Sequence, residues 1–314
     1  MILVVTHGRD LAADLVIRAL HRRAAKVIRL DTDRLGSPGH GCAVLPRIGP
    51  VLVLDGHVVP ADGIGAVWVR RFARPMVAAA AGPEFTGFVT REIFAVLDAV
   101  IETIPRQINP AEADRLAGNR LIQSAAARRE GLEIPETLVT QDAALARNFR
   151  AQHPDVVTKA ITFGQVVGDT TDDQGRFAFT SPLPPETPLD GLATCPSLFQ
   201  ARIPRVADWR VTTIGDRIFS ARLVADADGP ADWRQRPDAW EAFEAAELPA
   251  GIAAALLALS RNGGLVYAAH DLIERPDGGF VFLETNPAGQ WGWLELHAGL
   301  AIGDAIADEL LRPT

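Results

Sequence analysis

The chain has 314 residues, of which 48% are hydrophobic and 22% are charged, and its net charge is −8. This composition excludes intrinsic disorder, and the length suffices for two or three domains with sizeable cores. The acidic balance argues against a general nucleic-acid partner and against a membrane-surface partner, since both favour a basic face.

The sequence also argues against export and against a membrane span. No basic segment precedes the first apolar run, so we interpret that run as a strand and not as a signal peptide. The longest apolar runs are far shorter than the roughly 20 residues that cross a bilayer. Two cysteines, Cys42 and Cys195, provide neither a disulfide framework nor a cysteine-based zinc site. We therefore expect a cytoplasmic protein.

The first part of the chain predicts a small α/β domain over residues 1–110. Apolar runs at 2–6 and 27–33 flank an amphipathic stretch, which is the β-α-β pattern of a parallel sheet covered by helices. A hairpin, a strand, a long helix and a last strand follow, at residues 41–60, 66–72, 84–104 and 104–110.

Residues 111–314 predict a different order of elements. A helix over 111–131 is followed by strands with one helix between them, a Gly-rich loop over 164–175 and a Pro-rich connector. Three consecutive strands come next. The pattern ends with a helical segment over 238–263 that is interrupted at a proline, and with a hairpin that has a Pro-Asp-Gly-Gly turn.

Lysine is rare in this chain, since Lys26 and Lys159 are its two lysines among 31 basic residues. Lys159 lies within a β-branched apolar run, VVTKAI. A lysine in such a run is either a strand-edge residue whose ammonium extends into solvent or a buried cation with an anionic partner. The pattern leaves both alternatives open.

The C-terminal hairpin carries the clearest chemical signal. Asp271 lies in the middle of its first strand, and Glu284 precedes Asn286 by two residues in the second, so the latter two share a strand face. If the strands pair, all three side chains form an all-oxygen set of the kind that binds Mg²⁺ together with substrate phosphates. His270 points to the opposite face. The alternative is a polar, solvated face of an amphipathic hairpin.

Two common nucleotide-binding motifs are missing. The sequence contains neither GxGxxG nor GxxxxGK[ST], which argues against the P-loop class and against a dinucleotide oxidoreductase. The stretch GQVVGD at 164–169 is a weaker glycine signal. Such a loop can cover phosphates with backbone N–H groups, but a plain surface hairpin has the same composition.

Taken in order along the chain, these features resemble the ATP-grasp superfamily. More narrowly, they resemble the microviridin-type (graspetide) ligases that macrocyclise ribosomal peptides. The resemblance covers nearly the whole chain and is strongest in FLETNPAGQWGWLE at 282–295. It also rests on NRLIQ at 119–123, GLEIPETLVT at 131–140, the strand lysine, FQARIP at 199–204, DWRVTTIGD at 208–216 and HDLI at 270–273.

The resemblance implies the ATP-grasp fold, an α/β (α+β) architecture in three parts. These are an N-terminal pre-ATP-grasp domain over 1–110, a central subdomain with a phosphate-covering loop over 111–195, and a C-terminal subdomain over 196–314 with an antiparallel sheet and the Mg-ATP site. The implied reaction is phosphorylation of a side-chain carboxylate of a precursor peptide by ATP. A hydroxyl or amine of the same peptide then displaces the phosphate to form an ester or amide.

The same resemblance implies the nucleotide and metal ligands. Lys159 matches the lysine that contacts the nucleotide phosphates and adenine, and Asp208 matches the carboxylate that binds the ribose hydroxyls. The adenine hinge matches residues 199–203, with binding residues Gln200, Ala201 and Ile203. The Mg²⁺ ligands match Asp271, Glu284 and Asn286.

Arginines are the remaining candidates for the site. Arg210 lies on the strand face of Asp208, where its fork would reach the transferring phosphate or the acyl phosphate. Arg222 is expected to complete this anion pocket as a second catalytic residue, together with Arg234; the alternative is that both are surface arginines. Many ATP-grasp enzymes have a lysine where this chain has Arg120, which keeps the charge but not the geometry of a nucleotide contact.

The implied partners are ATP, Mg²⁺ and a ribosomal precursor peptide with leader and core segments, and the resemblance also suggests a homodimer. Two other functions share these residue patterns. A RimK-like ligase that adds amino acids such as glutamate to a peptide or small molecule has a similar D-x-R strand and E-x-N hairpin. A non-catalytic nucleotide-binding or peptide-binding protein is the other, and the complete residue set argues against it.

Overall fold

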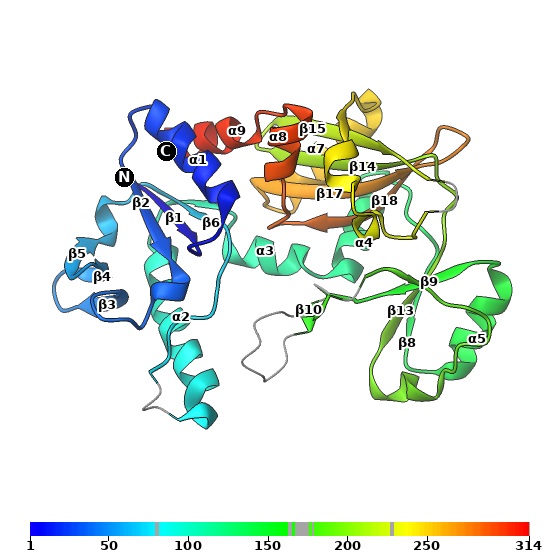
Figure 1. Cartoon of the computed structure of the whole chain (residues 1–314), viewed down its shortest axis with the longest axis horizontal. Helices are drawn as coiled ribbons and strands as arrows, with labels where there is room; N and C mark the ends of the chain where they lie inside the picture. The colour runs from blue at the N-terminus through cyan, green and yellow to red at the C-terminus, as the bar shows by residue number, and fades with distance from the viewer. Residues whose placement is uncertain (79–81, 163–164, 167–175, 178, 227–228, 314) are drawn as a thin grey trace. The chain divides into compact units, whose positions relative to one another are not determined.

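The computed structural model describes residues 1–78, 82–162, 165–166, 176–177, 179–226 and 229–313. The chain forms two compact units (Figure 1). Unit 1 comprises Met1–Pro110, Gln290–Gly292 and Ala301–Thr314, and unit 2 comprises Ala111–Gly289 and Trp293–Leu300. The predicted boundary near residue 195 falls inside unit 2, so the three-part division stays a prediction.

Unit 1 is built on a four-stranded parallel sheet, which confirms the predicted β-α-β opening. Leu3 and Val5 of the first strand pack against Leu97 and Val100 of helix α2 (Thr86–Glu102), so the core lies between sheet and helix. The strand order is β2-β1-β6-β7, with β1 at Ile2–Thr6, β2 at Val27–Asp31, β6 at Ala66–Val69 and β7 at Arg106–Ile108.

The two ends of the chain meet in unit 1. Helix α1 (Leu11–Arg22) lies beside helix α9 (Ile302–Leu311), as Figure 1 shows. Asp304 of α9 forms ion pairs with Arg22 and Arg23, at 2.9 and 2.6 Å. These contacts explain why the C-terminal helix joins the N-terminal unit.

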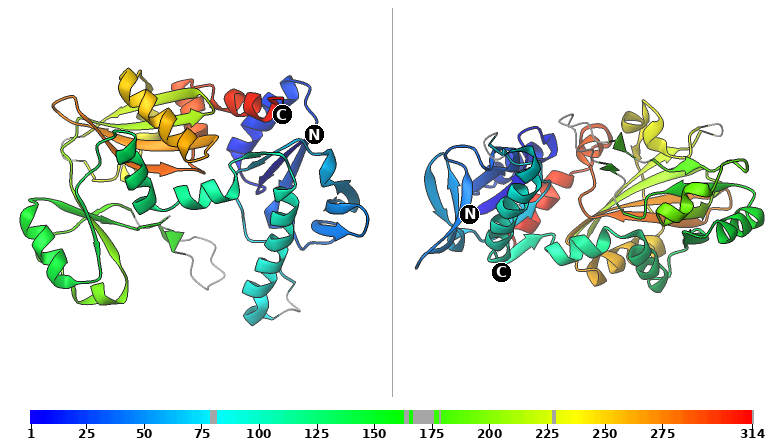
Figure 2. Two further views of the ribbon diagram at one scale, coloured as in Figure 1. Left: turned by 180° about the vertical axis from the view of Figure 1, so that it is seen from behind. Right: turned by 90° about the horizontal axis from the view of Figure 1, so that it is seen from below.

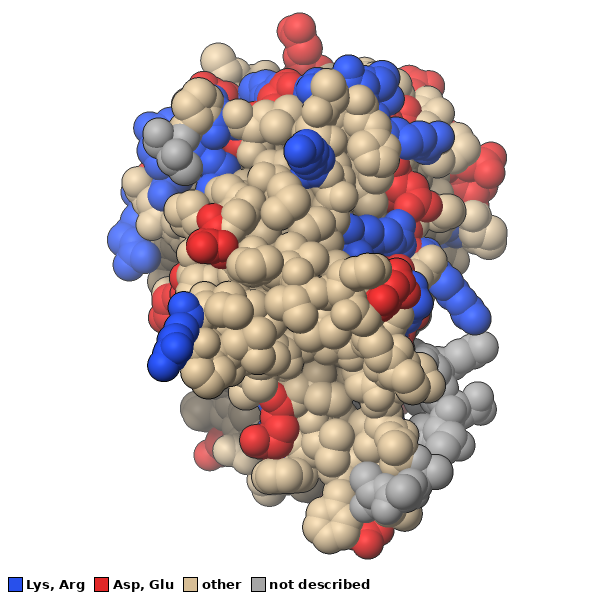
Figure 3. All heavy atoms as spheres, turned by 90° about the vertical axis from the view of Figure 1, so that its left-hand side faces the viewer, with Lys and Arg blue, Asp and Glu red and all other residues tan. Residues whose placement is uncertain are grey.

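A small antiparallel sheet completes unit 1. It consists of β3 (Gly41–Leu45), β4 (Gly49–Leu54) and β5 (His57–Pro60). Leu52 is fully buried in the core, whereas Val44 and Val58 are exposed. The face of unit 1 that carries this sheet and α2 shows few charged side chains (Figure 3). The small sheet therefore packs one side on the core and leaves apolar side chains in solvent on the other.

Unit 2 begins with two helices and an antiparallel sheet. Helix α5 (Ala143–Gln152) covers this sheet, and Ala146 packs against Val156 and Phe199. The helices α3 and α4 span Ala111–Ala117 and Arg120–Arg129; the sheet order is β12-β9-β13-β8, with β8 at Thr137–Thr140, β9 at Val156–Lys159, β12 at Ser181–Pro182 and β13 at Ser197–Ala201.

The predicted phosphate-covering loop lies mostly outside the described residues. Two short strands of this region are described, β10 (Gln165–Val166) and β11 (Arg176–Phe177), and they pair antiparallel. The loop therefore stays a prediction.

A five-stranded antiparallel sheet forms the rest of unit 2 and confirms the predicted C-terminal hairpin. Helix α7 (Ala250–Asn262) covers one face of this sheet (Figure 2). There Leu256 and Leu259 pack with Trp209 and Val211. The order is β16-β15-β14-β17-β18, with β14 at Ala207–Ile214, β15 at Arg217–Val224, β16 at Glu244–Ala245, β17 at Tyr267–Glu274 and β18 at Phe280–Asn286; helix α8 spans Gly292–Ala298.

The predicted helical segment over 238–263 is wrong in its first half. Helix α6 (Ala239–Ala242) ends after four residues, and β16 follows it before α7 begins at Ala250. Strand β16 pairs with Ala221 and Arg222 of β15. The unpaired edge of β15 offers backbone hydrogen bonds there, and these override the helix propensity of a Glu- and Ala-rich stretch.

Among the described residues, no helix combines the length and the apolar character that crossing a bilayer requires.

Candidate functional site

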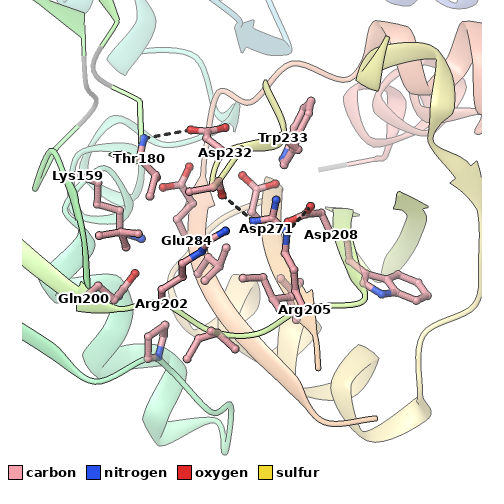
Figure 4. A pocket seen from close by; sticks show the side chains of 18 of the residues that line it. Lys159, Thr180, Gln200, Arg202, Arg205, Asp208, Asp232, Trp233, Asp271 and Glu284 are labelled. Carbon is pink, nitrogen blue, oxygen red and sulfur yellow. Dashed lines mark hydrogen bonds and ion pairs between the residues drawn. The ribbon is translucent and has the colours of Figure 1, made fainter. Parts of the chain in front are cut away.

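A pocket in unit 2 lies between the four-stranded and the five-stranded sheets. Lys159 of β9 and Gln200 of β13 enter it from one sheet, and Asp208 of β14 and Asp271 of β17 enter it from the other (Figure 4). Seven of the predicted site residues line it, namely Lys159, Gln200, Ala201, Ile203, Asp208, Asp271 and Glu284.

The C-terminal hairpin presents two carboxylates to this pocket. Asp271 and Glu284 are direct partners in the pairing of β17 with β18, and a register irregularity follows Asp271. Asn286 pairs with Ala269 on the same sheet face, but it is not a pocket-lining residue. Its side-chain oxygen accepts a hydrogen bond from the N–H of Ala288, at 3.0 Å. The pairing therefore places two of the three predicted metal ligands together in the pocket and the third beside them.

The pKa values of these two carboxylates are shifted in opposite directions, because burial and positive neighbours act with different relative strength on each. Burial raises the pKa of Asp271, although Arg210 acts against this. Burial also works to raise the pKa of Glu284, but the positive charges of Arg120 and Lys159 outweigh it and hold that pKa below its usual range. Glu284 is therefore the more firmly ionised of the two groups.

Buried polar contacts fix the two strands from behind. His270 is fully buried; its Nδ1 lies 2.9 Å from Thr285 Oγ1, and its Nε2 lies 3.0 Å from Ser260 Oγ. Burial lowers the pKa of His270 to about 3, so the ring is neutral at physiological pH. His270 lies on the sheet face opposite to the two carboxylates, as predicted. Its side-chain contacts link β17 to β18 and to α7.

Arg210 is buried behind the pocket and bonds one of the carboxylates. Its Nη1 donates to Asp271 Oδ1 at 2.7 Å, and 7% of the residue is exposed. Arg210 does not line the pocket itself. Arg210 therefore acts on the pocket through its ion pair with Asp271.

The sequence left two alternatives open for Lys159, and the described residues do not decide between them. Its side chain is half-buried and faces the pocket, and in the described ranges its ammonium makes no hydrogen bond or ion pair. Burial lowers the pKa of Lys159 to about 8, and the negative charge of Glu284 acts in the opposite direction. Among the described residues, no carboxylate therefore contacts this cation directly.

The predicted adenine hinge runs along the wall of the pocket. The Gln200 amide donates to Thr137 Oγ1 at 2.9 Å, and the Ala201 N–H donates to the carbonyl of Glu136 at 2.9 Å. The N–H of Ile203 has no hydrogen-bond partner within the part of the chain that is described. Ile203 therefore has a backbone donor available to a base, whereas the Gln200 side chain is already engaged.

Asp208 is a buried carboxylate at the opposite wall. Its Oδ2 lies 3.2 Å from Arg205 Nε, and the residue is 5% exposed. Burial raises the pKa of Asp208 to about 6, against the pull of Arg205. The folded protein therefore holds this carboxylate ionised at neutral pH at a cost in stability.

Asp208→Asn should stabilise the protein at alkaline pH. Because the folded pKa is about 6 and the unfolded value is near 4, the stability that Asp208 contributes is present below pH 4 and is lost as pH rises through 6. We expect the variant to gain about 3 kcal/mol in free energy of unfolding at pH 8 and nearly nothing at pH 4. Urea denaturation of both proteins at the two pH values measures this. A less stable variant at pH 8 would contradict the prediction.

Arg222 is not at this site, which corrects the prediction of a second catalytic arginine there. Arg222 pairs with Trp209 across β14 and β15, so it lies on the sheet face opposite to Arg210. Its Nε donates to Glu274 Oε2 at 2.7 Å. Neither Arg222 nor Glu274 lines the pocket.

Two charged pocket residues, Arg205 and Asp232, were not predicted, whereas Arg234, which the sequence grouped with Arg222 in an anion pocket, lines the pocket. Asp232 accepts hydrogen bonds from Arg234 at 2.8 and 2.6 Å and from the N–H of Thr180 at 3.2 Å. A repeat in the sequence could have indicated the pair of Asp232 and Arg234, since the tetrapeptide Ala-Asp-Trp-Arg occurs twice, at 207–210 and 231–234. Both copies contribute an aspartate to the pocket.

Comparison with known proteins agrees with the fold and extends over the whole chain. Residues 1–115 match the MvdD pre-ATP grasp domain. The chain is similar to macrocyclase MdnC from Microcystis aeruginosa MRC, solved with precursor peptide MdnA, at 28% identity, TM-score 0.87 and 99% coverage of both chains. It is also similar to a RiPP-associated ATP-grasp ligase from Chryseobacterium gregarium, solved with ADP and a leader and core peptide. That match has 26% identity and TM-score 0.89, and it covers 99% of this chain and 97% of the other.

A third similar structure supports the fold. ATP-grasp ligase PsnB, solved with a phosphomimetic variant of a minimal precursor, Mg and ADP, is 24% identical with TM-score 0.76, over 99% of this chain and 97% of PsnB. No curated protein matches the sequence significantly. The chain has the ATP-grasp fold and resembles ATP-grasp ligases of the RiPP macrocyclase type.

Proposed function

We propose that this chain, whose fold is that of RiPP-associated ATP-grasp ligases, is an ATP-dependent ligase that crosslinks a ribosomal precursor peptide. The carboxylate of an Asp or Glu side chain of the peptide is activated as an acyl phosphate. A Thr or Ser hydroxyl or a Lys amine of the same peptide then closes an ester or amide ring. The chain is thereby a ligase that releases ADP and phosphate.

The main support is the composition of one pocket. It joins two carboxylates from adjacent strands with a lysine ammonium that has no direct partner among the described residues. A phosphoryl transfer needs positioned positive charge and a cation site more than covalent help from the protein. Asp271, Glu284 and Lys159 supply these two requirements within one cavity.

The residues also fit the Mg²⁺ ion that such a reaction uses. Among the described residues, no group of three or more His, Cys, Asp or Glu side chains could form a complete metal cage. Mg²⁺ is usually held by one or two carboxylates together with substrate phosphates and waters. Asp271 and Glu284 would hold it, with Asn286 adjacent, and when bound the ion would neutralise charge on the phosphates.

The proposed reaction has two steps. An oxygen of the peptide carboxylate attacks the γ-phosphorus of ATP, and the bond to the bridging oxygen breaks, which gives an acyl phosphate and ADP. The hydroxyl or amine attacks the acyl carbon, its proton passes to solvent or to phosphate, and the C–O bond to phosphate breaks. The peptide loses one water in total.

The remaining pocket residues would orient the nucleotide. Lys159 would contact the phosphates as a point charge, and the N–H of Ile203 would donate to the adenine. Asp208 would accept hydrogen bonds from the ribose hydroxyls. Arg210 would hold Asp271 in place and supply positive charge behind it.

Intact-mass measurement tests the proposal. The chain is incubated with ATP, Mg²⁺ and a short peptide encoded next to its gene. A loss of one water mass per ring, with ADP formed, supports the macrocyclase. A gain of whole amino-acid masses when free amino acids are supplied would indicate the RimK-like ligase instead. ADP formation without a change in peptide mass would indicate that the substrate is not the peptide.

A further inference from the structure

Arg120 connects two parts of unit 2 that belong to different sheets. It is the first residue of α4, and its backbone N–H donates to the carbonyl of Ile161 at 3.1 Å. Its side-chain Nη1 donates to the carbonyls of Ala160, at 2.6 Å, and of Thr162. These three carbonyls follow Lys159 directly, so Arg120 holds the end of strand β9.

The other edge of the same guanidinium holds Glu284. Nε and Nη2 of Arg120 both donate to Glu284 Oε2, at 2.8 and 2.6 Å. In the described part of the chain, Oε1 of this carboxylate has no hydrogen bond. Arg120 therefore fixes the orientation of Glu284 through one oxygen and leaves the second oxygen available.

Helix α4 is itself fixed on the edge of β18 one turn later. Gln123 is buried, and its side-chain amide donates to the carbonyl of Thr285 at 2.7 Å and accepts from the N–H of Thr285 at 2.9 Å. This amide pairs with β18 as a neighbouring strand would. Successive residues of the strand, Glu284 and Thr285, are thus held by Arg120 and Gln123 of one helix.

We infer that Arg120 is a positioning residue and not a phosphate ligand. Arg120 acts through Glu284, because it orients the second oxygen of this carboxylate toward the cation. It also acts through residues 160–162, which it holds beside Lys159. This inference rests on the proposed function, because it concerns the same Mg-ATP site. It differs from the expectation that Arg120 contacts the nucleotide.

The hydrogen-bond count favours this role over a phosphate contact. A guanidinium has five N–H donors in a planar fork, and four hydrogen bonds of Arg120 already go to the protein. Carboxylate ligands of metals are usually held by such outer contacts, and loss of one typically weakens metal affinity by about 10–100-fold. A lysine has a single nitrogen and cannot bridge a carboxylate and two carbonyls with the same geometry.

The test separates metal affinity from nucleotide affinity. Variants Arg120→Lys and Arg120→Gln are compared with the wild type, and Arg115→Lys, which alters an exposed ion pair with Glu112 on α3, is the matched control. ADP binding is measured by calorimetry in EDTA, and Mn²⁺ binding to the ADP-loaded protein by electron paramagnetic resonance. We expect both Arg120 variants to lose about 10–100-fold in Mn²⁺ affinity with metal-free ADP affinity nearly unchanged.

A variant of Gln123 tests the inference if an Arg120 variant folds poorly, and hydrogen exchange tests the contact with residues 160–162 in variants that fold. Gln123→Met removes the contact of α4 with Thr285 but leaves Arg120 in place, and it should also weaken Mn²⁺ binding selectively. Hydrogen exchange of the peptide over residues 156–162 should be faster in the Arg120 variants and unchanged in Arg115→Lys.

A phosphate ligand would give the opposite pattern. Wild-type Mn²⁺ affinity in Arg120→Lys would overturn the inference, and so would a loss of metal-free ADP affinity as large as the loss of Mn²⁺ affinity. The proposed function fails separately, if the wild-type chain binds Mn²⁺ and ADP but never dehydrates a peptide. A wild-type chain that binds neither would overturn both.

Discussion

Glu284→Gln should reduce ATP turnover by about 10²–10³-fold and stop peptide crosslinking, because it removes one preorganised charge from the pocket. Glutamine keeps the volume of the side chain, and its oxygen can still accept hydrogen bonds from Arg120. The fold should persist, but the melting temperature should fall, because Arg120 then keeps a buried charge without its carboxylate partner. ADP formation by a coupled assay and intact peptide mass measure the two losses.

A matched variant on the other face of the sheet controls for general damage. Glu274 pairs with Arg222 at 2.7 Å and accepts from Trp209 Nε1 at 2.9 Å; neither Glu274 nor Arg222 lines the pocket, although Trp209 does. Glu274→Gln should leave ADP formation unchanged. Turnover that survives Glu284→Gln would contradict the assignment of the cation site, whereas equal losses in both variants would point to a folding defect.

The hairpin of the site was predictable because its signals are local. Alternating apolar residues and a Pro-Asp-Gly-Gly turn define two strands, and the period of two puts Glu284 and Asn286 on one face. The pairing of Asp271 with Glu284 was not predictable in this way. The register set by the turn pairs Leu272 with Phe282 and would place Leu283 opposite Asp271, but a register shift after Asp271 places Glu284 there instead.

Arg222 shows why other site residues could not be placed in the same way. Alternation says that every second residue of β15 shares a face, but it does not say which face meets the pocket. That depends on the register with β14, where Arg222 is opposite Trp209 and Ala221 is opposite Arg210. A shift by one residue would exchange the two faces, and register across two long strands is a tertiary property.

Lys159 and Arg120 depend on contacts that no local pattern contains. The apolar run around Lys159 suggested either solvent or an ion-pair partner, yet Arg120 occupies the carboxylate of Glu284 and leaves the lysine without a direct ion pair in the described residues. These residues come from α4, β9 and β18, which lie far apart in the sequence. The sequence predicted the members of the site but not the pairing of its charges.

Removal of Arg210 should destabilise the protein strongly, because it leaves a carboxylate buried without its partner. Arg210 and Asp271 have side chains that are 8% and 13% exposed and form an ion pair at 2.7 Å. A Cβ atom at Gly289 would lie 2.9 Å from Arg210 Nη2, so the guanidinium is also packed closely against the backbone. Breaking one partner of such a buried pair costs about 3–5 kcal/mol. We expect this loss for Arg210→Met in urea denaturation at pH 7.5.

Asp271→Asn in the same chain separates stability from function. The double variant has no uncompensated buried charge, so it should recover most of the stability that Arg210→Met loses. It should recover no ADP formation, because the carboxylate of Asp271 is then missing from the cation site. If the two substitutions destabilise additively, Arg210 and Asp271 do not form a coupled pair. If the double variant regains turnover, Asp271 does not hold the cation, and Arg210 acts on the reaction only by balancing its charge.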